Sequence, residues 1–144
     1  MNKDILTFFG NYRFLSNFYR VDFVWDSIVW PHSEGAFQAA KTLNRDARIA
    51  MADIADPAGA KAAGKRIELR PDWIEVRDNI MYAVVTEKFR QNPDLLAKLI
   101  ATGDAQLEEG NSWNDRYWGV CPVGSGNGEN KLGLILMLVR EKLQ

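Results

Sequence analysis

The chain has 144 residues, of which 47% are apolar and 26% charged, and its formal net charge is −1. This balance is typical of one globular domain and excludes a disordered chain. It leaves no surplus of positive charge for a stripe that follows an extended nucleic-acid backbone, although a local site for one or two phosphates is compatible with it.

Single cysteine and histidine residues limit the chemistry further. Cys121 has no partner for an internal disulfide, and a zinc site usually takes several Cys and His ligands, whereas His32 is the one histidine. We therefore expect no zinc site. The first residues lack the pattern of a signal peptide, and the longest apolar run, Leu134–Val139, is too short to cross a bilayer. A cytoplasmic protein is expected.

The predicted elements are a short hairpin followed by helices. Val21–Trp30 mixes aromatic and β-branched residues around Asp26-Ser27, which predicts two antiparallel strands and a tight turn. Helical patterns follow at about 33–41, 46–55, 56–64, 72–88, 92–103 and 131–142. No repeat or linker interrupts them. The fold class expected is α+β, a compact and mainly helical single domain over residues 1–144 with a small antiparallel β element.

Several of these helix limits rest on capping residues. Ser33 is a plausible N-cap, and Asp56-Pro57 reads as an N-cap followed by proline at the first helical position. Asp72 and Glu75 have the spacing of a capping box, and Gly103 suits a C-terminal cap. The last helix is apolar nearly all round, which predicts a central buried helix.

The segment from Ser33 to Lys41 carries the most informative polar residues. On a helical wheel Glu34, Gln38 and Lys41 lie within roughly 60° of one another. The opposite side is expected to pack closely through small residues and consists of Ala36, Ala39, Ala40 and Leu43. On spacing alone, the simpler interpretation of the polar row is a face in water. The alternative is that the row points into a cavity that holds a ligand.

If the row faces a ligand, its residue types suit a reaction at a sugar carbon. Glu34 lies in the first helical turn, where the backbone dipole favours an ionised carboxylate that can stabilise positive charge at a sugar carbon. Lys41 lies two turns further on, and a poorly solvated lysine has a lowered pKa and can attack a carbonyl-like carbon. About 10 Å of helix rise separates the two residues, so a ligand or water has to lie between them.

The long segment from Leu107 to Asn130 has no periodic pattern. Trp113, Asp115, Tyr117 and Trp118 interleave aromatic rings with a carboxylate, which would suit a planar base held between stacking faces. A loop anchored to the core by its tryptophans explains the pattern equally well. The glycine-rich stretch 124–128 matches no phosphate-binding motif, because Glu129 replaces the third glycine of a dinucleotide fingerprint. Asn130 after it could cap the last helix.

Eight short motifs in one order resemble a known family. They are Phe14-Leu15-Ser16-Asn17-Phe18-Tyr19, Glu34-Gly35-Ala36-Phe37-Gln38-Ala39-Ala40-Lys41, Arg70-Pro71-Asp72-Trp73, Lys88-Phe89-Arg90-Gln91-Asn92, Thr102-Gly103, Glu109-Gly110-Asn111, Trp113-Asn114-Asp115-Arg116-Tyr117-Trp118-Gly119, and Asn130-Lys131-Leu132-Gly133 with Leu136-Met137 and Arg140. Together they resemble the NADAR (YbiA-like) family of N-glycosidases over nearly the whole chain.

The resemblance implies a mainly helical α+β domain that hydrolyses a ribosyl C1–N bond without a metal or redox cofactor. The substrates implied are phosphoribosylamino-pyrimidine intermediates of riboflavin biosynthesis or ADP-ribosylated guanine, either as a small molecule or within nucleic acid. By position, Glu34 would be the catalytic carboxylate and Lys41 an amine that forms a Schiff base with the opened ribose. The residues implied to line the pocket are Asn17, Phe18, Gln38, Trp73, Trp113, Asp115 and Trp118.

One position departs from the family pattern, and one alternative function stays open. Many relatives carry histidine or asparagine after the motif glutamate, where this chain has Gly35. The change removes a hydrogen-bonding group beside Glu34 and leaves Glu34, Gln38 and Lys41 intact. The alternative is a non-catalytic module that binds ADP-ribose or NAD, which would need the aromatic pocket but no lysine nucleophile.

Overall fold

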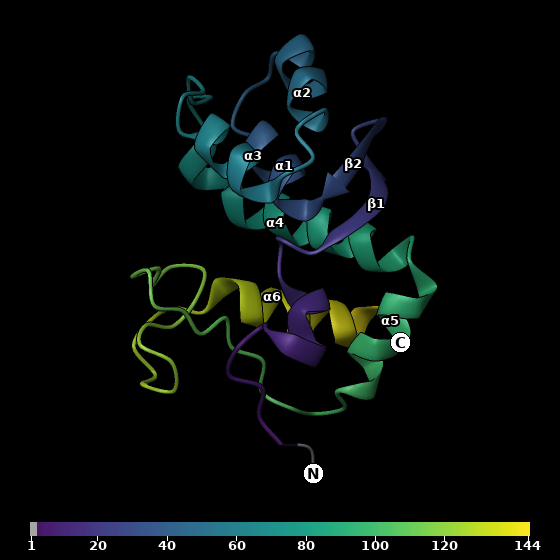
Figure 1. The fold of residues 1–144 in the computed structure, drawn as a ribbon, viewed down its shortest axis with the longest axis vertical. Helices are drawn as coiled ribbons and strands as arrows, with labels where there is room; N and C mark the ends of the chain where they lie inside the picture. Colours follow the sequence, from purple (N-terminus) through teal and green to yellow (C-terminus); the bar gives the residue numbers. More distant parts are fainter. Residues whose placement is uncertain (1–2) are drawn as a thin grey trace. The chain divides into compact units, whose positions relative to one another are not determined.

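The computed structural model describes residues 3–144, in which helices predominate over one two-stranded sheet (Figure 1). The chain divides into two compact units. Unit 2 is Asn17–Asn92, and unit 1 combines the segment up to Ser16 with Pro93–Gln144. The mainly helical α+β fold with a small antiparallel element is confirmed. The single domain over residues 1–144 stays a prediction.

The hairpin of unit 2 forms as predicted, slightly longer at both ends. β1 (Arg20–Trp25) pairs antiparallel with β2 (Ile28–His32), with Phe23 opposite Trp30 and Val24 opposite Val29. Phe23 and Trp30 are buried, whereas Val24 and Val29 are exposed. This alternation shows that one face of the hairpin covers the core and the other faces solvent.

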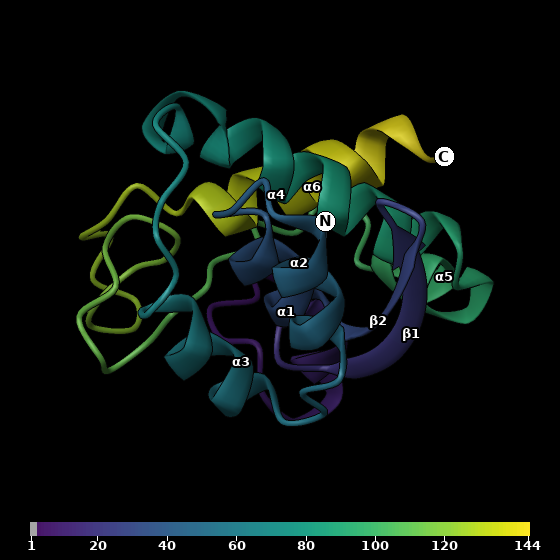
Figure 2. The ribbon, with the colours of Figure 1, turned by 90° about the horizontal axis from the view of Figure 1, so that it is seen from above.

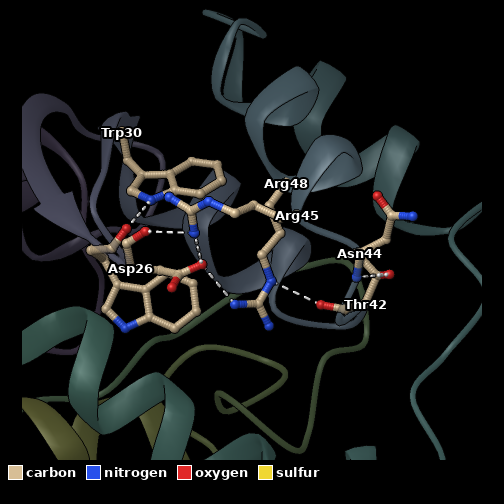
Figure 3. A network of polar contacts seen from close by, with 7 residues as sticks. Asp26, Trp30, Thr42, Asn44, Arg45 and Arg48 are labelled. Atoms are coloured by element: carbon tan, nitrogen blue, oxygen red, sulfur yellow. Dashed lines mark hydrogen bonds and ion pairs between the residues drawn. The ribbon is translucent and has the colours of Figure 1, made fainter.

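The turn of the hairpin is held by the helix α2 (Arg45–Ala52) (Figure 3). Asp26 and Ser27 both have φ of 57°, a conformation that residues with side chains rarely adopt. The Asp26 carboxylate accepts hydrogen bonds from Arg48 Nη1 at 2.9 Å and from Arg45 Nη1 at 3.3 Å. The Arg48 guanidinium lies 5.2 Å from the centre of a Trp25 ring. These bonds fix the turn against α2.

Four helices complete unit 2: α1 (Ser33–Ala39), α2, α3 (Pro57–Gly64) and α4 (Trp73–Arg90). α1 packs against α2, α3 and α4, and it continues directly from β2 (Figure 1). Ala36 and Ala39 are fully buried in a core cluster with Trp30, Met51 and Val84. Small side chains at 36 and 39 allow the neighbouring elements to approach α1 closely, as the wheel predicted.

Unit 1 consists of the 3₁₀ helix η1 (Gly10–Leu15), α5 (Pro93–Ala101), α6 (Lys131–Lys142) and a long loop that Figure 2 shows as a coil in green to yellow. Arg140 of α6 is buried, and its Nη1 donates to Thr102 Oγ1 at 3.0 Å and to the Ala105 carbonyl at 2.9 Å. The predicted cap Gly103 has φ of 64° and donates to the Ile100 carbonyl. One arginine therefore joins α6 to the end of α5.

Two of these predicted caps, Ser33 and Asp72, are wrong, and the second helix has a cap that was not predicted. His32 caps α1 in place of Ser33, and Asn44 caps the next helix, which begins at Arg45. Asp72 precedes α4 but makes no capping hydrogen bond, since its carboxylate binds Arg70 at 2.6 and 3.0 Å. Asp56 does cap α3 as predicted, through a hydrogen bond from the Ala58 amide.

The last helix also differs from the prediction. Leu134 and Leu138 of α6 are 51% and 41% exposed, so one side of the helix faces solvent. Asn130 precedes α6 but does not cap it with its side chain, which instead accepts from the Glu109 amide and donates to the Leu107 carbonyl. No helix within residues 3–144 combines the length and the apolar content that a bilayer span requires.

Candidate active site

The two members of the polar row that lie in α1, Glu34 and Gln38, are buried. Glu34 and Gln38 are only 9% and 6% exposed, and every residue from Ser33 to Ala39 is buried. The interpretation of this row as a face in water is therefore wrong. The wheel also misplaced Leu43, which is 67% exposed beyond the end of the helix. A buried carboxylate needs hydrogen-bonding or charged partners, and the surrounding residues supply them.

Asn17 fixes the first turn of α1. Its carbonyl oxygen accepts a hydrogen bond from the Glu34 amide at 3.0 Å, and its Oδ1 accepts one from Ser33 Oγ at 2.8 Å. Its Nδ2 donates to the sulfur of Met81 on α4 at 3.5 Å. The backbone of Glu34 is thus held from outside the helix. A direct contact between Asn17 and substrate stays a prediction.

His32 links β2 to α1 as a neutral imidazole. Its Nδ1 accepts a hydrogen bond from the Gly35 amide at 2.9 Å, and its Nε2 lies 3.0 Å from the Ile54 carbonyl. The two partners require the tautomer with hydrogen on Nε2. Burial lowers the pKa of His32 below 6.5, and Arg20 adds to this shift; the hydrogen bond to the Ile54 carbonyl and, to a smaller extent, Asp56 oppose it. Protonation would place hydrogen on Nδ1 and break the cap.

We expect the stability of the protein to fall as the pH drops below about 6.5. Because the unfolded imidazole binds a proton near pH 6.5 and the folded one only at lower pH, the free energy of unfolding decreases from pH 6.5 down to the lowered pKa of His32 and then levels off. Urea unfolding at pH 7.5 and pH 5.5 measures this. His32→Asn, which retains a capping group, should show a smaller difference; an equal difference would contradict the assignment.

The side chain of Gln38 holds the Glu34 carboxylate from the next turn. Gln38 Nε2 donates to Glu34 Oε2 at 2.9 Å. The other amide atom, Oε1, is buried and has no hydrogen-bond partner among residues 3–144. It lies against Gly64, the last residue of α3, where a β-carbon would come 1.9 Å from Oε1 and 2.6 Å from the amide carbon. The absence of a side chain at position 64 therefore leaves room for the amide in this orientation.

Gly64→Ala is expected to disturb the site more than the fold. The new methyl group displaces the Gln38 amide from Glu34, and the loss of a hydrogen bond to a charged group corresponds to a decrease in kcat of about tenfold. Alanine stabilises a helix relative to glycine, which limits the loss of stability. Steady-state kinetics and urea unfolding separate the two effects.

A double-mutant cycle provides the control for Gly64→Ala. In Gln38→Ala most of the atoms that meet the new methyl group are gone, so adding Gly64→Ala should lower kcat no further. Gly59→Ala is a matched control on the same helix, since its β-carbon would meet Ile54 at 3.2 Å and no atom of Gln38. Additive losses in the cycle would contradict the steric link.

Lys41 follows the end of α1, which is two residues shorter than predicted. Its amide donates to the Gln38 carbonyl at 3.2 Å, and its carbonyl accepts from the Arg70 amide at 2.8 Å. The side chain is half-buried, and burial lowers its pKa; the Glu34 carboxylate opposes the shift, and Lys65 and Lys61 add to it. A lowered pKa increases the fraction of neutral amine at pH 7, which is the nucleophilic form.

The two aromatic residues predicted for the pocket in unit 2 differ in exposure. Phe18 is 41% exposed, so its ring is accessible to a ligand. Trp73 is buried at the start of α4, with its ring centroid 5.2 Å from that of Phe37 on α1. Trp73 therefore stabilises the packing of α1 on α4, and a stacking role toward a base stays a prediction for both residues.

The predicted residues of the long loop lie in unit 1. Asp115 Oδ1 accepts hydrogen bonds from the amides of Tyr117 at 3.1 Å and Trp118 at 2.9 Å, which makes a tight turn. Trp118 is half-buried and meets the Tyr117 ring edge-on at 4.9 Å, whereas Trp113 is 52% exposed. The loop is thus ordered by its own residues. That Trp113, Asp115 and Trp118 share a pocket with Glu34 stays a prediction.

Two buried polar residues stand in the family-like motifs but were given no role by the sequence analysis. Asn111 is 1% exposed, and its side chain bonds Glu109 and Asp115 in the loop. Lys88 of α4 is also 1% exposed, with Nζ 5.1 Å from the Phe89 ring centre and 5.8 Å from that of Tyr19. Burial lowers the pKa of Lys88 to about 7. Lys88 lies on the apolar face of the predicted helix, and this position was the sequence signal for its burial.

No metal centre is visible in the part of the chain that the structure describes. Within residues 3–144, no three His, Cys, Asp or Glu side chains come together in an arrangement that could hold a metal ion. The candidate catalytic side chains of unit 2 are therefore a carboxylate, an amide and amines. Such groups suit acid–base or nucleophilic chemistry at a sugar carbon.

Comparisons with known proteins find relatives over nearly the whole chain. Residues 7–144 match the family model described as the NADAR domain. The chain is 36% identical over 148 residues to the N-glycosidase YbiA of Escherichia coli, covering 99% of this chain and 91% of YbiA. The NMR structure of E. coli YbiA superposes with a TM-score of 0.85 at 36% identity, over 99% of this chain and 86% of that one.

A further relative is a longer protein. The chain is 39% identical over 136 residues to a riboflavin biosynthesis protein of Vibrio vulnificus, which covers 93% of this chain. The chain spans only 36% of the length of that protein. The similarity therefore concerns one part of the Vibrio protein.

Proposed function

Because the chain belongs to the NADAR family, we propose that it hydrolyses the bond between C1 of a ribose and the nitrogen of a base, with Glu34 and Lys41 as its catalytic residues. That the protein is an N-glycosidase follows from the family and from relatives that bear this name over nearly their whole length. The observation that carries the residue assignment is the buried Glu34 carboxylate, held 2.9 Å from Gln38 and close enough to Lys41 to influence its charge.

The proposed first step is departure of the base. The C1–N bond breaks with its electron pair on the base, and positive charge develops at C1. The ionised Glu34 carboxylate stabilises this charge, and its burial strengthens the interaction relative to water. The hydrogen bond from Gln38 and the backbone contact with Asn17 keep the carboxylate in place before substrate binds.

The proposed second step is capture of the sugar by Lys41. The lone pair of the neutral amine forms a bond to C1, and one N–H proton passes to the departed base. The bond between C1 and the ring oxygen then breaks, the second N–H proton passes to that oxygen, and the opened ribose is held as a Schiff base. Water adds to that carbon and the C–N bond to Lys41 breaks, which restores the amine. The net reaction consumes one water molecule and gives free base and free sugar. The lowered pKa of Lys41 supports this role, since a protonated amine has no lone pair to donate.

The proposed substrates are phosphoribosylamino-pyrimidine intermediates of riboflavin biosynthesis or guanine that carries ADP-ribose. The name of the Vibrio vulnificus relative supports the first group. The test offers purified protein both substrates and follows the free base by liquid chromatography. Turnover of either one supports the hydrolase. Tight binding of ADP-ribose or NAD without turnover of either substrate would instead identify a binding module.

A further inference from the structure

The glycine-rich part of the long loop contains the one asparagine of the sequence that glycine follows, Asn127-Gly128. Residues 122–129, all of which the structure describes, are exposed and form no helix or strand. An asparagine before glycine is chemically labile, because the next amide nitrogen can attack the side-chain amide carbon and glycine has no side chain that shields this nitrogen. The stretch that matches no phosphate-binding motif is therefore a candidate for covalent change.

Both reacting groups are accessible in the fold. Within residues 3–144, the side chain of Asn127 and the amide of Gly128 make no hydrogen bond. The bonds that hold this segment use other atoms: the Asn127 amide donates to Ser125 Oγ at 3.1 Å, and the Asn127 carbonyl accepts from the Cys121 amide at 3.0 Å. The two atoms that would have to join, Cγ of Asn127 and the nitrogen of Gly128, thus belong to exposed residues and to groups without hydrogen bonds.

The fold also requires glycine at position 128. Gly128 has φ of 148°, and a β-carbon there would lie 2.2 Å from the carbonyl oxygen of Gly119 and 3.1 Å from the Cα of Val120. A residue with a side chain does not fit this position. The packing of the loop therefore maintains the labile pair, since a change at the glycine would disturb the loop.

We propose that Asn127 is a site of spontaneous deamidation in the folded protein, with water as the co-reactant. The nitrogen of Gly128 forms a bond to Cγ of Asn127, the bond from Cγ to Nδ2 breaks, and the departing ammonia takes up the proton of the Gly128 amide. Water then opens the resulting cyclic imide. Cleavage of the bond between the imide nitrogen and Cγ gives aspartate. Cleavage at the main-chain carbonyl carbon gives isoaspartate, which has one methylene more in the main chain.

The isoaspartate form changes the loop beyond position 127. The additional methylene displaces Gly128, which has no space to move toward Gly119. The next residue, Glu129, donates from its amide to the Arg116 carbonyl at 2.8 Å. We expect this bond to be weakened, so that amide hydrogen exchange at Glu129 becomes about tenfold faster in the isoaspartate form. Asn127→Asp adds the same charge with an unaltered main chain and should leave the exchange rate unchanged.

The test follows the whole protein, folded and unfolded in guanidinium, in mildly alkaline buffer, which favours loss of the proton from the attacking nitrogen. Trypsin releases residues 117–131 as one peptide, which contains both Asn127 and Asn130. We expect deamidation of Asn127 in the folded protein at a rate within about tenfold of that in the unfolded protein, because opening of an exposed loop costs little free energy. Asn130 is the matched internal control, since its side chain and the amide of Lys131 that would attack it are both hydrogen-bonded.

The outcomes are read by peptide mass spectrometry and by labelling with a methyltransferase specific for isoaspartate. Deamidation of Asn127 that is about a hundredfold or more slower in the folded than in the unfolded protein would overturn the proposal. Equal rates at Asn127 and Asn130 in the folded protein, or ammonia release that continues in Asn127→Gln, would also overturn it. A labelled fraction with unchanged exchange at Glu129 would contradict the effect on the loop. These measurements need no turnover, so their failure is distinguishable from failure of the proposed function.

Discussion

Glu34→Gln is expected to lower kcat about a thousandfold, while KM changes little. The amide has the size of the carboxylate but cannot stabilise positive charge at C1. Its buried position next to Gln38 makes the loss specific to the reaction, because the hydrogen-bonding partner is retained. Initial rates of base release measure the effect, and urea unfolding checks that the variant folds.

A matched control for this variant is Glu75→Gln. Glu75 also lies in the first turn of a helix, α4, but is exposed, so its replacement should leave kcat within about twofold. If Glu34→Gln kept a tenth or more of the wild-type kcat, the carboxylate would not be the group that stabilises the transition state.

Lys41→Met is the second substitution with a large expected effect. It should lower kcat about a hundredfold or more and abolish the adduct that borohydride traps between enzyme and sugar. In the wild-type protein, the yield of trapped adduct should rise as the pH passes upward through the lowered pKa of Lys41, because the neutral amine is the reactive form. Peptide mass spectrometry locates the adduct.

Lys88 provides the comparison, since it is the other amine of unit 2 whose pKa burial lowers. Lys88→Met should retain the adduct on Lys41, because methionine fills the volume of the lysine stem in an apolar surrounding. An adduct that mapped to the peptide with Lys88 would transfer the nucleophilic role to that residue. Turnover that did not change in Lys41→Met would remove the covalent step.

The elements of the fold were predictable where short-range patterns determine them. The hairpin alternates large buried and exposed side chains around a turn, and the Asp56-Pro57 pair marks the start of α3, so both followed from the sequence. The caps at His32 and Asn44 could not be predicted from the sequence. His32 depends on the Ile54 carbonyl, 22 residues away, which holds the ring in the right orientation. A hydrogen bond between residues so far apart in the sequence cannot be predicted from short-range patterns.

For the polar row of α1, the sequence predicted which residues are neighbours but not what surrounds them. The spacing placed Glu34 and Gln38 on one face of α1, and in the structure a hydrogen bond joins them. A helical wheel does not say what covers a face, so the same spacing favoured water. Burial arises from Asn17 and Gly64, which approach from other segments of unit 2.

Some motif residues prove to have structural tasks. Thr102 and Arg140 both lie in segments that resemble the family, and they bond each other at 3.0 Å between the ends of α5 and α6. Asn111 orders the loop through Glu109 and Asp115. A match to a family motif therefore does not by itself assign a residue to the reaction, because the scaffold explains these three positions.

The imidazole cap has an evolutionary consequence. A β-carbon at position 35 would lie 2.9 Å from Cε1 and 3.2 Å from Nδ1 of His32, and both ring nitrogens are already engaged. A lineage that acquires a larger residue at 35 must first, or simultaneously, exchange the histidine for a smaller group. Glycine and histidine should thus be inherited as a pair, and their joint replacement would mark the point at which related sequences diverged.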